Sequence, residues 1–524
     1  MQWRTAVVKN KSIIFADMKI MYCIRGLHNS GGMERVLSVK ANLLASRGHE
    51  VSIVVLRLKG RKPFFPIDPS VNIVDLSAPY LSLPGHPSSA NATSDSPRTT
   101  VSSAVGSTAS PATGSARTEG IASVPATGAS ERLKGSVRKR LSRVVEMLDP
   151  DVCVSLCGPE VRILPAVAGG RPCVAEYHFS HDKFYRKYGG IFMYPYAWLR
   201  THMLERAVSE YDCMVTLTEH DLPIWKRHCR RVERIFNPVT TPPGQVSRLA
   251  EKRMIAVGRL EDQKNFKDLV SAWSIVAERC PDWRLEIFGE GKLEHALRSQ
   301  IARLGLTGSV ILRGVVKDIA SEYSNSSALL MTSLHEGFPL ALVEASSFGL
   351  PLISYDCPTG PSEIIVDAGD GGFDGDGRGA GAGAGDGARA GAGAGAGTSV
   401  GADSGAGAGD GGGAGAGADA GDCDGAGAGT NDGADAVADH CFNSYGGNGA
   451  GNVPAATLDQ EAGNTPNGYL VPVGDVRTLA DRICRIASDD NLRLRLGAAS
   501  KASSHRFTPE TIISAWEHLF SSLL

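Results

Sequence analysis

The chain has 524 residues, a mass of 55.1 kDa and a formal net charge of −2. A chain of this length is too long to fold around one ordinary hydrophobic core, so we expect two domains. The near-neutral charge argues against nucleic-acid binding. The 11 cysteines are scattered singly, which is typical of a reducing compartment rather than of a disulfide framework. No apolar run has the length of a membrane span, and the N-terminal residues lack the apolar core of a signal peptide. We therefore expect a cytoplasmic protein.

Three segments are expected to stand apart from the fold. Residues 1–17 are interpreted as a leader or a mis-assigned start, because Met18 directly precedes the first apolar strand. Residues 84–130 consist mainly of Ser, Thr, Ala, Pro and Gly, and residues 369–464 are dominated by Gly-Ala repeats with interspersed aspartates. Neither segment can bury enough apolar surface to offset chain entropy, so both are predicted to be disordered insertions.

The first half alternates apolar strands with amphipathic helices. A strand at 19–24 is followed by a glycine turn and a helix that carries Met33, Val36, Leu37 and Leu44 on one face. Further strands are predicted at 50–56, 71–76, 152–156, 173–176 and 213–217, with a helix at 132–148. This alternation predicts a Rossmann-like domain with a parallel sheet over residues 18–236.

A second series of the same kind begins after a Pro-rich hinge at 237–252. Strands are expected at 254–257, 284–288, 310–312, 328–331, 352–354 and 468–472, with helices near 266–278, 293–304 and 340–348. We predict a second Rossmann-like domain over 253–508, and a helix at 509–524 that crosses back to the first domain. Two such α/β domains facing each other would bind ligands beyond the C-terminal ends of their strands.

The segment from Glu336 to Glu344 carries the strongest chemical signal. Gly337, Phe338, Pro339 and Leu340 lie between an apolar strand and a helix, and Pro339 suits the first helical turn because its missing N–H costs nothing there. The free amides of that turn and the helix dipole favour an anion. Glu344 lies about two turns beyond Glu336, so the two carboxylates can contact a ribose and a sugar. The alternative is a helix-terminal charge followed by a solvated glutamate.

Two cations follow the first strand of the second domain. Gly258 and Arg259 end that strand, and Lys264 comes five residues after Arg259. Arginine can bind phosphate oxygens in a bidentate manner and lysine adds a point charge, so the pair can neutralise a departing diphosphate. No Asp-x-Asp motif lies at a strand end, so we expect neither a metal nor another cofactor. Taken alone, both residues could be ordinary surface charges.

Glycines follow several strands at the same kind of position. Gly31 and Gly32 follow the first strand and open a helix, where the backbone can approach a phosphate closely. Gly289 and Gly314 hold comparable positions in the second domain and could form walls around a nucleoside. Each is weak evidence alone, since many strand-to-helix turns contain glycine.

Taken in order, these motifs resemble the retaining glycosyltransferases of family 4, which have the GT-B fold. The resemblance rests on the sequence segments 29–36, 257–265, 288–291, 313–314, 336–344, 357–365 and 467–472. It covers nearly the whole chain except the two insertions and the first 17 residues. The departure is the long Gly-Ala tract, where the family has a short turn.

The resemblance implies that the domain at 18–236 lies on the acceptor side and that the domain at 253–508 binds the donor. It also implies roles for individual residues. It implies that Glu336 contacts the donor sugar and Glu344 the ribose, and that Arg259 and Lys264 bind the diphosphate. It also implies a histidine near the reacting sugar, for which His178 is the best match and His181 a rival; either could be a plain loop histidine.

The expected activity is transfer of a hexose or N-acetylhexosamine from a nucleotide-diphosphate sugar, UDP- or GDP-linked, to a glycan or lipid-linked acceptor in cell-surface polysaccharide synthesis. An inactive nucleotide-sugar-binding protein with a Gly-Ala tether is the alternative, and a phosphorylase or epimerase is a weaker one. Basic residues could attract the protein to an anionic membrane surface, or could form solvated helix faces. They are Arg132, Lys134, Arg138, Lys139, Arg140 and Arg143, and then Lys226, Arg227, Arg230 and Arg231.

Overall fold

The computed structural model describes residues 17–78, 80–81, 131–132, 136–187, 191–242, 244–369 and 465–524. The predicted leader, apart from residue 17, lies outside the described residues. So do the predicted insertion at 84–130 and all of the Gly-Ala tract after Gly369.

The first half of the chain forms a seven-stranded sheet in the order β3-β2-β1-β6-β7-β8-β9, and every pairing in it is parallel. Its strands are apolar on both faces, as expected for a parallel sheet covered by helices. The strands are β1 (Lys19–Ile24), β2 (Glu50–Val55), β3 (Asn72–Asp75), β6 (Val152–Ser155), β7 (Cys173–Glu176), β8 (Cys213–Thr216) and β9 (Val232–Arg234). The helices are α1 (Gly32–Ser46), α2 (Val137–Leu148), α3 (Lys183–Lys187), α4 (Tyr194–Val208) and α5 (Leu222–Trp225). A short antiparallel pair joins β4 (Tyr80–Leu81) to β5 (Glu131–Arg132).

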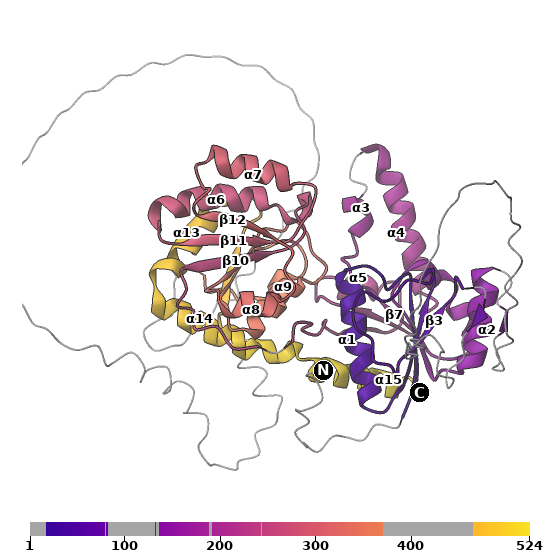
Figure 1. Cartoon of the computed structure of the whole chain (residues 1–524). Coiled ribbons are helices and arrows are strands. Elements are labelled where there is room, and N and C mark those ends of the chain that lie inside the picture. Colours follow the sequence, from indigo (N-terminus) through magenta and orange to yellow (C-terminus); the bar gives the residue numbers. More distant parts are fainter. Residues whose placement is uncertain are drawn as a thin grey trace, which may run out of the picture. The chain divides into compact units, whose positions relative to one another are not determined.

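The second half forms a six-stranded parallel sheet in the order β12-β11-β10-β13-β14-β15. Helices cover both faces of the sheet, with α6 and α7 on one face and α8 and α9 on the other (Figure 1). The strands are β10 (Arg253–Val257), β11 (Arg284–Phe288), β12 (Val310–Gly314), β13 (Leu329–Met331), β14 (Leu352–Tyr355) and β15 (Gly468–Val471). The helices are α6 (Phe266–Arg279), α7 (Glu294–Arg303), α8 (Ile319–Ser324), α9 (Leu340–Ser347), α10 (Pro361–Ile364), α13 (Val476–Ser488), α14 (Asp490–Ser503) and α15 (Pro509–Ser521). Short 3₁₀ turns lie at Pro159–Arg162, Pro165–Val167, Ile191–Met193, Asp262–Lys264 and Ser504–Phe507.

The predicted pair of parallel α/β sheets is confirmed, with differences in detail. The helix expected from residue 132 begins at Val137, and the sequence analysis did not anticipate α4 or β9. The last helix, α15, buries Ile513, Trp516 and Phe520 in the core of the first sheet, so the chain does return to its first half. The proposed domain boundaries stay a prediction.

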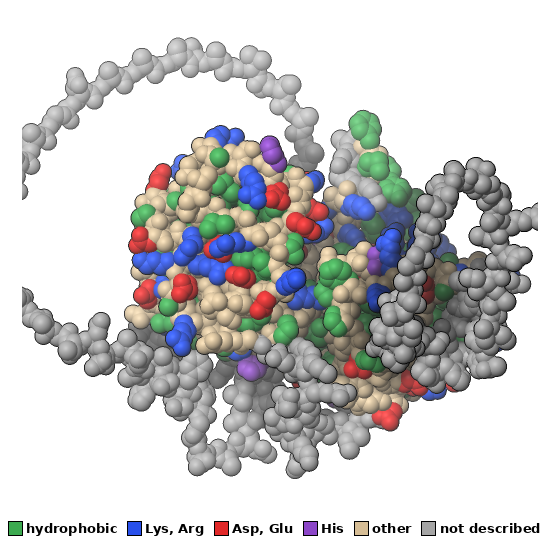
Figure 2. Space-filling view, in the orientation of Figure 1, with side chains coloured by type: hydrophobic (Ala, Val, Ile, Leu, Met, Phe, Trp, Pro, Cys, Tyr) green, Lys and Arg blue, Asp and Glu red, His purple; other side chains and the backbone are tan. Residues whose placement is uncertain are grey.

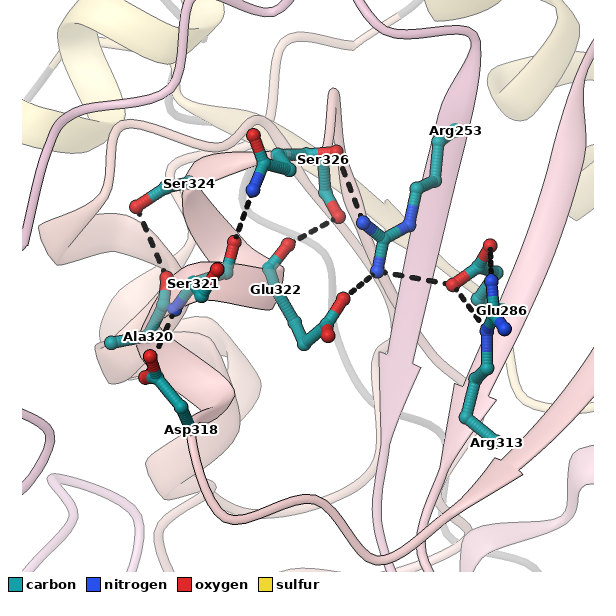
Figure 3. Close-up of polar contacts among 10 residues, drawn as sticks. Arg253, Glu286, Arg313, Asp318, Ala320, Ser321, Glu322, Ser324 and Ser326 are labelled. Atoms are coloured by element: carbon teal, nitrogen blue, oxygen red, sulfur yellow. Dashed lines mark hydrogen bonds and ion pairs between the residues drawn. The ribbon is translucent and has the colours of Figure 1, made fainter.

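A polar network ties α8 to the second sheet (Figure 3). Glu286 on β11 accepts two hydrogen bonds from the Arg313 guanidinium, at 2.7 and 2.8 Å, and lies 3.1 Å from Arg253. Arg253 also pairs with Glu322 on α8. Burial alone would raise the pKa of Glu286, but the two arginines outweigh it and lower that pKa. The Glu286 carboxylate on the second sheet therefore holds the side chain of Arg313, the residue before Gly314.

Candidate functional site

Two loops meet at the C-terminal edge of the second sheet, because β10 and β13 are parallel neighbours. The loop after β10 contains Gln263 and Lys264, and the loop after β13 contains Thr332 and His335. The Thr332 hydroxyl donates to the Lys264 carbonyl at 3.0 Å, and the Gln263 amide donates to the His335 carbonyl at 2.8 Å. These bonds fix the loop of the two predicted cations against the loop that leads to Glu336.

Lys264 and Glu336 form an ion pair at this edge. The Lys264 Nζ lies 2.6 Å from Oε1 of Glu336, and the two side chains are only 17% and 10% exposed. The Thr359 hydroxyl donates to the Glu336 carbonyl, which anchors the loop from the neighbouring strand end. The structure therefore brings together the two residues that the sequence analysis placed on the diphosphate and on the donor sugar.

Arg259 occupies a different environment from Lys264. Its side chain is 67% exposed and pairs with Glu261 at 2.9 Å. Both cations follow β10, but only Lys264 is held by a second catalytic candidate. The exposed guanidinium lies on a short loop and can turn toward an anion at the strand end. This would break only a surface ion pair, which contributes little to stability.

Glu344 is fully engaged by protein groups. Its carboxylate accepts hydrogen bonds from the Thr240 hydroxyl at 2.7 Å and the Tyr323 hydroxyl at 3.1 Å, and lies 2.9 Å from an Arg35 nitrogen. Arg35 also donates to Thr241 at 3.2 Å. A ribose would therefore have to share or displace one of these partners, a constraint that the sequence did not reveal.

The helix start in front of Glu344 differs slightly from expectation. Pro339 is the residue before the helix, with φ −78° and ψ 95°, and Leu340 is the first helical residue, whereas we expected Pro339 inside the first turn. Phe338 is buried and stacks against Phe236, with ring centroids 5.4 Å apart. The first amides of a helix lack intrahelical acceptors, so those of Leu340 and Ala341 offer an anion site beside the Lys264–Glu336 pair.

Gly337 lies against the loop that follows β7. A Cβ atom there would come within 2.4 Å of the His178 carbonyl oxygen and 3.0 Å of the Phe179 Cα. Only glycine permits this approach. The contact places the predicted histidine loop directly beside the predicted donor-sugar glutamate.

Glycines also shape the loops after β10 and β11. Gly289 has φ +137°, and a Cβ atom there would lie 1.9 Å from the Gly258 carbonyl oxygen. Gly258 itself lies against the aliphatic part of Lys264. Gly314, at φ +70°, ends β12 with open space around it. All three predicted glycines thus sit at the same sheet edge as Lys264.

The predicted glycine loop of the first half also lies close to the start of α9. Gly31 precedes α1, and Gly32 begins it. A Cβ atom on Gly32 would lie 3.2 Å from a Leu340 side-chain carbon. The start of α1 therefore lies beside the start of α9, and both offer first-turn amides.

A buried chain of charges supports His178. Its Nε2 lies 3.1 Å from Oε1 of Glu176, although the angle is not that of a good hydrogen bond. Both Glu176 oxygens lie 2.6 Å from the Lys40 Nζ, and all three side chains are nearly inaccessible. Burial by itself raises the pKa of Glu176, but Lys40 and His178 outweigh it and lower this pKa to about 2. Burial lowers the pKa of Lys40, against the opposing effect of Glu176.

His181, the rival candidate, is committed elsewhere. Its Nε2 lies 2.8 Å from a Glu205 oxygen, and its ring stands edge-on to Trp225, 5.1 Å away. His228 lies 3.4 Å from the same oxygen. The geometry favours His178, which shares its loop contact with Gly337.

Lys40, Glu176, Arg35 and Thr240 were missed as site residues. The signal for Lys40 was present, because it falls on the apolar face of α1 with Val36, Leu37 and Leu44, where a lysine needs a buried partner. Its partner, 136 residues away, has no sequence signature. The sequence predicts that the protein binds no metal, and this stays a prediction.

Residues 242–373 match the sequence family described as glycosyl transferases group 1. The matched region contains every second-half site residue named above. It includes Lys264, Glu336 and Glu344.

Similar sequences extend this likeness over part of their length. An uncharacterized glycosyltransferase of Haemophilus influenzae is 26% identical over 350 residues, which cover 66% of this chain and 83% of that protein. The amylovoran biosynthesis glycosyltransferase AmsD of Erwinia amylovora is 40% identical over 119 residues, covering 23% of this chain and 33% of AmsD.

Solved structures show the same fold. TarM has a TM-score of 0.57 and 11% identity, with 97% of this chain and all of that chain covered. Anabaena HepE, in a complex with UDP, has a TM-score of 0.54 and 14% identity, with 96% of this chain and all of HepE covered. The chain is a glycosyltransferase with the two-sheet GT-B fold, and its residues 242–373 match glycosyl transferases group 1.

Proposed function

We propose that this enzyme transfers a hexose or N-acetylhexosamine from a UDP- or GDP-linked sugar, with retention of configuration as in family 4, to a glycan or lipid-linked acceptor of a cell-surface polysaccharide. One observation carries the donor part: the Lys264–Glu336 pair stands beside the open amides of α9 and the His178 loop. The names of relatives support the acceptor class. AmsD is named for amylovoran biosynthesis, and an Escherichia coli relative is named a lipopolysaccharide 1,6-galactosyltransferase.

Charge neutralisation at the leaving group is the main catalytic contribution in this proposal. The bond between the anomeric carbon and the diphosphate oxygen breaks, and the diphosphate keeps the electron pair. The acceptor oxygen forms the new bond on the same face, and its proton passes to a departing phosphate oxygen. Lys264, Arg259 and the first amides of α9 stabilise the negative charge that develops there. Glu336 orients both Lys264 and the sugar hydroxyls.

We also propose that the transfer needs no divalent metal. Lys264 and Arg259 lie at the strand end where a metal-dependent enzyme would need carboxylate ligands, and both can pair with diphosphate oxygens. Addition of EDTA should therefore leave nucleotide release unchanged, and loss of release that Mg²⁺ or Mn²⁺ restores would contradict this part.

The test of the donor site is a panel of nucleotide sugars with nucleotide release as the readout. Glu336→Ala and Lys264→Ala should each abolish most release. Lys292→Ala is a matched control, because Lys292 forms a similar pair with Asp262 at 2.5 Å on the same half of the chain, but with both side chains about two-thirds exposed. Full turnover by Glu336→Ala and Lys264→Ala would disprove the assignment.

We propose, in addition, that the protein rests on a membrane surface through the beginning of α4. Phe192, Tyr194 and Trp198 are 94%, 60% and 52% exposed, and Figure 2 shows hydrophobic side chains gathered at this end of the helix. Arg200 and Arg186 lie on α4 and the neighbouring α3. Aromatic side chains next to cations suit the headgroup region of an anionic bilayer. None of the helices in the described ranges has the length and apolar character required to cross a bilayer.

Vesicle flotation tests this surface. The protein should float with vesicles that contain phosphatidylglycerol more than with pure phosphatidylcholine, and Phe192→Ser with Trp198→Ser should abolish flotation. The basic residues of α2 provide the comparison, because Arg138 and Lys139 are exposed on a helix that itself contains no aromatic residue. If Arg138→Gln with Lys139→Gln abolishes flotation and the aromatic variant does not, the surface is on α2 instead.

A further inference from the structure

A cavity of about 470 Å³ lies at the C-terminal ends of β1 and β2, beside the glycine loop of the first half. Its size is within the range of small-molecule sites. The residues around it come from the loop between β1 and α1 and from the loop after β2, where parallel sheets bind ligands. They are Arg25, Gly26, His28, Asn29, Met33, Glu34, Arg57, Lys59 and Arg61.

Four cations surround this cavity, and the proposed donor chemistry uses none of them. Arg25, Arg57, Lys59 and Arg61 are all exposed, and none of them forms an ion pair with any residue that the structure describes. The one carboxylate in the lining, Glu34, is mostly buried and accepts a hydrogen bond from the Asn29 amide at 3.3 Å. Four like charges with only one carboxylate among them repel one another, so an anion in the cavity would relieve a cost that the free protein carries.

The loop after β2, which carries Arg57, Lys59 and Arg61, has a defined shape. Asp75, at the end of β3, accepts hydrogen bonds from the backbone N–H groups of Leu58 and Gly60, both at 3.3 Å. The Lys59 N–H donates to the Ser77 hydroxyl at 2.9 Å, and Lys59 has a left-handed φ of 54°. A non-glycine residue in this conformation is held by its surroundings. The cations are therefore presented by a fixed loop.

A histidine in the lining also has an unsatisfied polar atom. The Nδ1 atom of His28 is buried and has no hydrogen-bond partner among the described residues. A buried polar atom without a partner is costly, and a ligand oxygen or a water held by a ligand would satisfy it. This observation is independent of the four charges.

We infer that this cavity binds a phosphate or diphosphate group on the acceptor. The inference rests on the proposed function. The donor residues Lys264 and Glu336 lie on the second sheet and the cavity lies on the first, so we assign its ligand to the acceptor. Guanidinium groups bind phosphate oxygens in a bidentate manner, and Arg25, Arg57 and Arg61 could together contact both phosphates of a diphosphate. The substrate class is a phosphorylated acceptor, either a lipid-linked saccharide diphosphate or a soluble sugar phosphate.

Titration calorimetry on the whole protein tests this site with two probes, inorganic pyrophosphate and farnesyl diphosphate. Saturating UDP or GDP is present so that the donor site is filled. We expect saturable binding of at least one probe, which Arg57→Gln with Arg61→Gln weakens by more than about tenfold, in line with the loss of two charged hydrogen-bond donors. Tighter binding of farnesyl diphosphate identifies the lipid-linked source, and equal binding identifies the soluble one.

Arg227→Gln with Arg230→Gln is the matched control, because these two exposed arginines of the same half give the same change in net charge. It should leave probe affinity within about twofold of the wild type. Absence of saturable binding, or equal loss in both double variants, would overturn the inference. UDP binding to the Arg57→Gln, Arg61→Gln protein is measured separately, so that failure of the donor proposal and failure of this cavity are distinguishable.

Discussion

Lys40 on α1 and Glu176 at the end of β7 form an ion pair from which solvent is excluded, with the Lys40 Nζ 2.6 Å from both carboxylate oxygens. The ammonium also lies 3.8 Å from the centre of the Trp516 ring on α15. The pair therefore connects the helix that begins at the glycine loop, the strand that leads to His178 and the last helix of the chain. A charge pair in such a place is stable only while both members are present.

Glu176→Gln should lower the free energy of unfolding by about 3–5 kcal/mol, because it leaves the Lys40 ammonium buried without a counter-charge. Urea unfolding followed by circular dichroism measures this. The double variant Lys40→Met, Glu176→Leu should recover most of the loss, since an apolar pair does not carry the desolvation cost. A loss below about 1 kcal/mol in the single variant would show that the pair does not stabilise the fold.

Stability should also fall with acid through Glu176. The pKa of this group is lowered to about 2 in the folded protein, below an unfolded value of about 4.3. The contribution of Glu176 to the free energy of unfolding is therefore complete above about pH 4.3. It is lost as the pH falls toward 2, by an amount on the order of 3 kcal/mol. Unfolding measured from pH 2.5 to 6 should show this decline in the wild type. The Glu176→Gln protein should lack the part of this decline that Glu176 causes.

Glu176 should matter for catalysis as well as for stability. We expect Glu176→Gln to lower kcat about 10–100-fold with little change in the donor KM, because His178 loses the carboxylate that orients it. Glu517→Gln is the control, since Glu517 is also a buried carboxylate, paired with Arg47 and with His49 at 3.1 Å. If both variants lower kcat equally at a temperature where both are folded, Glu176 has only a structural role.

Removal of Lys264 should cost more than removal of Arg259. Lys264→Met should lower kcat by about 10²–10³-fold, as expected for loss of one preorganised group at a developing charge. Arg259 is 67% exposed, so Arg259→Gln should have a smaller effect that shrinks further as salt screens the exposed charge. Steady-state nucleotide release at 50 and 500 mM salt checks both. The reverse order of the two effects would contradict the site geometry.

Gly289→Ala should disrupt the strand-end loops. Its φ of +137° and the 1.9 Å approach to the Gly258 carbonyl leave no room for a methyl group, so we expect a loss of about 2 kcal/mol or more in stability and weaker nucleotide binding. Gly308→Ala is the matched control, because nothing lies within 4 Å of a Cβ atom there and its φ is not positive. Equal thermal shifts in the two variants would disprove this reading of Gly289.

Much of the fold could be predicted because strand and helix periodicities are local. The β1, β7 and β11 ranges agree with expectation, and the other predicted strands differ by one or two residues at their ends. The helix α4 was missed because its exposed aromatic residues give no clear apolar face, and β9 was missed because it has only three residues. Short or irregularly patterned elements are decided by the neighbours they pack against.

The sequence by itself determined the chemistry available at the second sheet. The order of Arg259, Lys264, Gly289, Glu336 and Glu344 along alternating strands and helices is enough to place them at one sheet edge, since parallel strands end on the same side. Only the tertiary structure decided which of them touch. It joined Lys264 to Glu336, surrounded Glu344 with Thr240, Tyr323 and Arg35, and buried Lys40 against Glu176. Those pairs join residues that lie between 21 and 136 positions apart in the sequence, and further still for Arg35 and Glu344. They share no local pattern, so only packing brings their charges within reach of one another.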